Sequence, residues 1–98
     1  MIFRIARLRR AIERRHHCNA RHVGSRIIVE QLPQGGVWRG QVDVFDLTGH
    51  PQAERCYAWL DEGPGRTTCK IRLKVPPVRS AQTAVRASLT RRTKNRAV

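Results

Sequence analysis

Three cations alternate with apolar residues in one segment of the chain. Lys70, Arg72 and Lys74 occupy every second position of residues 67–75, and the positions between them are apolar. This alternation is typical of a half-buried strand with one face in the core and one in water. At roughly 3.3 Å of rise per residue, the three cations lie about 7 Å apart. The pattern predicts a fixed row of cations that faces phosphate groups.

Further cations gather at both ends of the 98-residue chain. The net charge is +7 over residues 1–26, −4 over residues 27–65 and +10 over residues 66–98, for a total of +13. A charge distribution of this kind indicates a polyanionic partner, or simply a highly soluble protein whose basic ends are solvated. It says nothing about the fold or about a reaction. We expect the cations of the two ends to be mobile additions to the row. They are Arg4, Arg7, Arg10, Arg14, Arg91, Arg92, Lys94 and Arg96.

Metal-ligand residue types cluster at one place only. His16, His17 and Cys18 are consecutive, and His22 follows Cys18 at a spacing of four. A structural zinc site needs four ligands, usually in two paired sets, and no second pair follows this cluster. The sequence therefore predicts no metal site and no cofactor, and indicates an exposed His-rich linker.

His50 lies near Asp43 and Asp46, and an acid paired with a histidine could serve general acid–base catalysis. However, no nucleophile is signalled beside it, and its neighbours Gly49 and Pro51 are ordinary turn residues. No phosphate-binding loop or dinucleotide fingerprint is present. We therefore expect His50 to be a turn residue and predict no catalytic residues and no enzyme activity.

Tyr57 and Trp59 share one face of a predicted strand. Such a pair can stack nucleic-acid bases while neighbouring cations hold phosphates. It can equally belong to the core, because each ring buries a large apolar area. The RNA-recognition motif expected of a base-stacking sheet is absent, so the core interpretation is favoured.

Two helices and four strands are predicted to position these residues. Apolar spacings of three and four predict a basic amphipathic helix over residues 2–16, and residues 17–25 lack any period and read as a linker. Predicted strands cover residues 26–32, 37–47, 54–61 and 67–75. A change of apolar parity near Val44 and Phe45 predicts a β-bulge in the second strand. Ser80 is the expected N-cap of a helix over residues 80–90.

The fold class that follows is α+β. Short turns predict an antiparallel meander of three or four strands, packed by the C-terminal helix, with the N-terminal basic helix as a second candidate cover. We expect a basic helix and linker extension over residues 1–25, one domain over 26–90, and a basic tail, frayed or disordered, over 91–98.

The block from Val37 to Leu89 resembles a family of small uncharacterised bacterial proteins. The matching strings are VWRG at 37–40, VDVFDL at 42–47, GHP at 49–51, Ala53, Arg55, YAW at 57–59, PPV at 76–78 and TAV at 83–85. The resemblance implies no activity, because the family has none established. Residues 1–25 depart from the family pattern.

Taken together, the residues favour a non-enzymatic protein that binds nucleic acid or another polyanion with little sequence specificity. The alternative is a protein-interaction or assembly module that uses a sheet edge or pairs its basic ends with an acidic partner. Three cysteines, no secretory signal and no membrane-spanning stretch indicate a cytoplasmic protein with free thiols. No membrane partner and no small-molecule substrate are expected.

Overall fold

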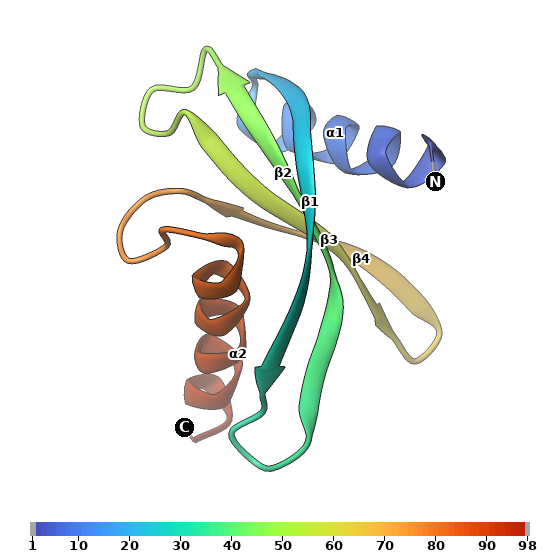
Figure 1. The fold of residues 1–98 in the computed structure, drawn as a ribbon, viewed down its shortest axis with the longest axis vertical. Helices are drawn as coiled ribbons and strands as arrows, with labels where there is room; N and C mark the ends of the chain where they lie inside the picture. Colours follow the sequence, from blue (N-terminus) through green and yellow to red (C-terminus); the bar gives the residue numbers. More distant parts are fainter. Residues whose placement is uncertain (1, 98) are drawn as a thin grey trace.

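The fold is the predicted α+β arrangement with four strands. The structure, a computed structural model, describes the backbone of residues 2–97 and the side chains of residues 3–89. The strands form one open antiparallel sheet in the order β1-β2-β3-β4, a meander that follows the chain (Figure 1). The elements are α1 (Ile2–His16), β1 (Asn19–Gln31), β2 (Val37–Thr48), β3 (Arg55–Gly63), β4 (Arg66–Leu73) and α2 (Ala81–Ala97).

The sheet consists of two long hairpins that cross near their middle. β1 and β2 pair along almost their whole length, and so do β3 and β4. The two hairpins pair with each other only where Asp43–Asp46 of β2 lie opposite Arg55–Ala58 of β3, and their ends diverge from there (Figure 1). The crossing point is therefore the centre of the molecule.

Each face of the sheet is covered by its own helix. On one face, Leu8 and Ile12 of α1 pack with Phe45, Cys56 and Ile71. On the opposite face, the apolar side of α2 packs with strand residues of the other parity. This second cluster contains Val44, Tyr57, Trp59, Ala81, Ala84, Val85 and Leu89. The C-terminal helix is a cover as predicted, and the N-terminal helix is a second one.

The two covers correct the prediction of a bulge in β2. Val42 and Val44 face α2, whereas Phe45 and Leu47 face α1, so both parities of one regular strand are buried. The register shift lies instead in the partner strand β1, between His22 and Gly24. The change of apolar parity in the sequence therefore reflects a strand that is buried on both faces.

The linker predicted over residues 17–25 is also wrong. Strand β1 begins at Asn19, so the boundary expected at residue 25 falls inside it, and Ala20 is buried in the α1 cluster. At the other end, the backbone of α2 continues to Ala97, through most of the expected basic tail. Within residues 2–97 no helix is long and apolar enough to cross a membrane.

Candidate anion-binding surfaces

The outer face of α1 carries a stripe of exposed side chains, here called the α1 stripe: Phe3, Arg7, Arg10 and Arg14. Spacings of four, three and four place them on one side of the helix, away from Leu8 and Ile12. Phe3 is 87% exposed. Arg7 reaches the carbonyl oxygen of Thr67 at 3.4 Å. With 1.5 Å of rise per residue, the Cα atoms of neighbouring arginines in the stripe are spaced roughly 4.5 to 6 Å along the axis.

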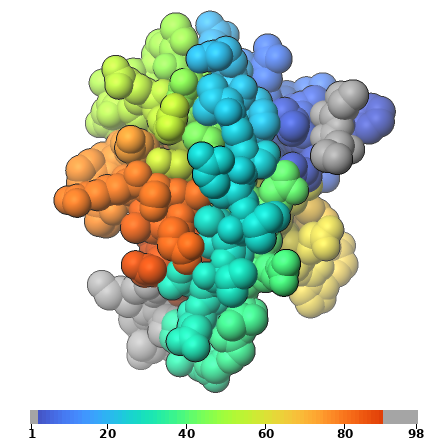
Figure 2. All heavy atoms as spheres, viewed as in Figure 1, coloured from blue at the N-terminus to red at the C-terminus, as the bar shows by residue number. Residues whose placement is uncertain are grey.

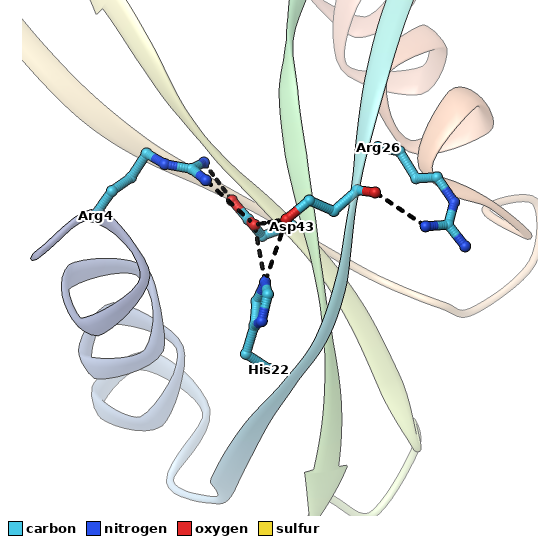
Figure 3. A network of polar contacts seen from close by, with 5 residues as sticks. Arg4, His22, Arg26 and Asp43 are labelled. Atoms are coloured by element: carbon cyan, nitrogen blue, oxygen red, sulfur yellow. Dashed lines mark hydrogen bonds and ion pairs between the residues drawn. The ribbon is translucent and has the colours of Figure 1, made fainter. Parts of the chain in front are cut away.

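Arg4 does not belong to this stripe, although the sequence grouped it with the others. Its guanidinium points inward and forms an ion pair with Asp43 of β2. The Asp43 carboxylate is fully buried at the hairpin crossing, where it also accepts hydrogen bonds from Ser25 Oγ at 2.6 Å and His22 Nε2 at 2.9 Å (Figure 3). Arg4 therefore anchors α1 to the sheet.

Ser25, His22 and the buried Asp43 are not arranged as a catalytic triad. In a triad the histidine bridges the other two residues through different ring nitrogens. Here Ser25 and His22 Nε2 both contact the same oxygen, Asp43 Oδ1, and Arg4 holds the carboxylate from the other side. The arrangement pairs and hydrogen-bonds the buried Asp43 carboxylate, and this stabilising contact is its role.

The three cations of the predicted row share one face of the β4 hairpin, but their surroundings differ. Lys70 and Arg72 are half-buried and stand directly across from Trp59 and Tyr57 in the register. Lys74, just past the end of β4, is exposed. The row faces the α2 side of the sheet, since Cys69, Ile71 and Leu73 pack on the α1 side. The row and the α1 stripe therefore lie on opposite faces.

A groove lies where the segment entering α2 passes over β1, on the α2 side of the sheet. Its volume is about 550 Å³. Four cations line it: Arg26 of β1, Arg55 of β3, Lys74 and Arg79. In the space-filling view the orange start of α2 lies against the cyan β1 (Figure 2). We call this feature the α2 groove; of the predicted site residues whose side chains the structure describes, only Lys74 lines it.

Most of the acids are occupied inside the molecule. Arg55 Nε donates to Asp46 at 2.7 Å, and this hydrogen bond lowers the pKa of the Asp46 carboxyl below its ordinary value. Glu30 of β1 accepts hydrogen bonds from Arg86 and Gln82 of α2, which lower its pKa in the same way. Because Asp46 and Glu30 are already paired, they do not neutralise the other exposed cations of the molecule.

His16, His22 and His50 make side-chain contacts within the fold. His50 Nδ1 accepts hydrogen bonds from the backbone N–H groups of Gln52 and Ala53, at 3.0 and 3.1 Å, which confirms it as a turn residue. The His16 ring packs edge-on against His50, and burial, with the nearby His50, lowers the pKa of His16. The described residues include no group of three or more His, Cys, Asp or Glu side chains that could hold a metal ion.

Tyr57 and Trp59 are core residues, as the sequence favours. They are 5% and 3% exposed, and Trp59 packs edge-on against Trp38 with ring centroids 6.1 Å apart. Buried rings cannot stack on bases, so the base-stacking interpretation of this pair is wrong. The exposed aromatic ring of the molecule is Phe3 on α1.

All three cysteines, Cys18, Cys56 and Cys69, are free thiols. Cys56 is fully buried at the crossing of the hairpins, and burial raises the pKa of its thiol to about 12. A thiol that ionises so reluctantly is a poor nucleophile, so Cys56 acts as a core residue.

No protein-family model, curated protein or solved structure matches the chain. The resemblance of the block from Val37 to Leu89 rests on its own residues alone.

Sequence reasoning missed three of the four cations of the α2 groove. Arg26, Arg55 and Arg79 come from β1, β3 and the loop before α2, and only the crossing of the hairpins brings them together. One signal was available at Arg79, which directly precedes the N-cap Ser80 in a helix whose first turn has no acid. A cation at that end of a helix is electrostatically unfavourable unless an anion is nearby. The side chains of Arg91, Arg92 and Lys94 lie outside the described residues.

Proposed function

We propose that this protein binds nucleic acid with little sequence specificity through the α1 stripe. The observation that carries the proposal is the one-sided arrangement of Arg7, Arg10 and Arg14 on the solvent face of an anchored helix. None of the three forms an ion pair with an acid among the described residues. Guanidinium groups bind phosphate through bidentate, charge-assisted hydrogen bonds.

The anchoring of α1 supports this proposal. A cationic helix that is free in solution must lose conformational entropy when it binds, and a docked helix has already lost it. Leu8 and Ile12 are fully buried and Arg4 is paired to Asp43, so the opposite stripe is presented in a fixed orientation. Contacts to phosphate position a protein on nucleic acid without reading bases, which accounts for the low specificity.

Phe3 extends the stripe at the start of α1. An exposed aromatic ring beside cations suits single-stranded nucleic acid, because any base can stack on it. The proposal therefore includes single strands as well as duplexes, in a reducing, cytoplasmic setting in which the free thiols persist. No chemical step is assigned to the protein.

The test uses variants that remove the same charge from different places. Arg10→Ala/Arg14→Ala removes two cations from the α1 stripe, and Arg39→Ala/Arg66→Ala removes two exposed cations of β2 and β4. Fluorescence anisotropy with labelled oligonucleotides of several sequences at low salt gives the affinities. We expect the stripe variant to lose about tenfold in affinity for every sequence, corresponding to about 1.4 kcal/mol, and the control to lose much less. Equal losses in the two variants, or no binding by the wild type, would refute the proposal.

A further inference from the structure

The α2 groove has the charge composition of a site for a small anion. Its four cations come from four separate segments: Arg26, Arg55, Lys74 and Arg79. No Asp or Glu lines it. Arg55 is offset by its ion pair with Asp46, whereas Arg26, Lys74 and Arg79 are exposed and form no ion pair with a described acid. Asp46 also offsets part of the charge of Lys74, which helps to lower the Asp46 pKa. The cations around this hollow still outnumber that one acid, and an anion would relieve their repulsion.

The walls of the groove are held in place by hydrogen bonds. Tyr57 donates its hydroxyl hydrogen to the carbonyl oxygen of Arg79 at 3.3 Å, which fixes the segment before α2 over β3. On the opposite wall, Arg26 Nη1 donates to the carbonyl oxygen of Ser25 at 2.9 Å (Figure 3). The same nitrogen lies near Gly24, where an added Cβ would be 3.5 Å away, next to the β1 register shift. These contacts fix the segment before α2 over β3 and orient the Arg26 guanidinium beside Gly24.

Part of the lining of the groove is apolar. Ile28, Val44, Tyr57 and Ala81 form its base but are only 5–6% exposed, whereas Val23 is 39% exposed and offers an accessible apolar side chain. A volume of about 550 Å³ falls in the range of small-molecule sites, which combine an apolar surface with a few placed polar groups. A larger neighbouring recess of about 1090 Å³ shares Arg55 and Lys74 but contains Asp46 and Glu54, so its mixed charge favours no anion.

We propose that the α2 groove binds a phosphate monoester carried on a small organic group, the chemistry of a mononucleotide. The cations would hold the phosphate, and the exposed Val23 side chain would pack against the organic group. This site is separate from the α1 stripe, because the groove opens on the α2 side of the sheet and α1 covers the other side. It is a small-molecule site of a kind that the sequence alone does not indicate.

The inference is tested by titrating the full-length protein with adenosine monophosphate. Binding is monitored by calorimetry and by nitrogen–proton spectra. We expect saturable one-to-one binding, with shifts at Gly24, Arg26 and Ala81. Lys74→Ala/Arg79→Ala should weaken binding at least about tenfold, since it removes two charged partners. Arg39→Ala/Arg66→Ala, which removes the same charge from β2 and β4, is the control and should bind as the wild type does. Adenosine should not bind detectably, and inorganic phosphate should bind more weakly than the nucleotide.

Two further oligonucleotides distinguish a free nucleotide from a nucleic-acid end. If a 5′-phosphorylated strand binds more tightly than its 5′-hydroxyl counterpart, and Lys74→Ala/Arg79→Ala abolishes that difference, the strand end supplies the monoester. If the two strands bind equally while adenosine monophosphate saturates the groove, a free nucleotide supplies it. Absence of saturable nucleotide binding, or equal weakening in both double variants, would overturn the inference. Neither result bears on the α1 stripe, which is tested with Arg10→Ala/Arg14→Ala.

Discussion

At the scale of single residues, Asp43 organises the centre of the molecule. It is the buried acid at the hairpin crossing, and its partners come from α1 and β1: Arg4, His22 and Ser25. A buried charge is tolerated only when it is paired and hydrogen-bonded. In the sequence, Asp43 stands near His50, and Arg4 belongs to the cations expected to be mobile. Neither pattern shows that Asp43 and Arg4 meet, because their contact depends on how α1 packs on the sheet.

Asp43→Asn should strongly destabilise the protein, because it leaves the Arg4 guanidinium without its counter-charge. We expect a loss of about 3–5 kcal/mol in the free energy of unfolding, measured by urea denaturation. Asp46→Asn breaks a partly exposed ion pair with Arg55 and should cost about 1 kcal/mol or less. Equal costs for the two variants would show that the Asp43 cluster does not anchor α1.

Gly40 of β2 is required for a close approach of Trp38. A Cβ at this position would lie 2.7 Å from Cη2 of the Trp38 indole. Gly40→Ala should therefore displace the ring from its edge-on contact with Trp59, at a cost of roughly 1–3 kcal/mol. Near-ultraviolet circular dichroism and chemical denaturation measure both effects. Gly63→Ala, where nothing lies within 4 Å, is the control, and an equal response there would contradict the argument.

At the scale of elements, the periodic segments were predictable and their surroundings were not. The α1 helix, the four strands and the Ser80 cap follow from local patterns, and Ser80 Oγ does accept a hydrogen bond from the Thr83 N–H. The first half of β1 was missed because its apolar positions are interrupted by Arg21, His22 and Gly24 around the register shift. The false bulge in β2 arose because its change of apolar parity was interpreted as a register slip, whereas both faces of the strand are buried.

The contact between α2 and the edge strand β1 should make stability sensitive to acid. Glu30 accepts hydrogen bonds from Arg86 and Gln82, and its pKa is lowered from an ordinary 4.5. A carboxyl with a lowered pKa in the folded state stabilises the fold above its ordinary pKa, and this contribution is lost as the pH falls below about 4.5. Stability should therefore decrease with acid in this range.

Glu30→Gln removes this contribution and tests it. The variant should lose about 1 kcal/mol or less at neutral pH, and its free energy of unfolding should depend less on pH below 4.5 than that of the wild type. Urea denaturation at a series of pH values measures this. Glu62→Gln, at an exposed position of β3, should keep the wild-type profile. An unchanged acid profile in Glu30→Gln would contradict the assigned contact.

At the scale of the whole molecule, the charge sorted along the sequence is distributed over two faces of the fold. The predicted single field separates into the α1 stripe on one side and Lys74 with the α2 groove on the other. Asp43 and Asp46 of the central segment lie at the crossing and pair with Arg4, Arg55 and Arg21. The separation allows each cationic surface to be altered without touching the other.

The salt dependence of nucleic-acid binding tests the central claim most directly. For duplex DNA, each phosphate neutralised adds about −0.9 to the slope of log affinity against log salt concentration. The slope of Arg10→Ala/Arg14→Ala should be shallower than that of the wild type by about 1.8, for two lost contacts, and Arg39→Ala/Arg66→Ala should keep the wild-type slope. A flat wild-type dependence, or an identical change of slope in both variants, would contradict binding through the α1 stripe.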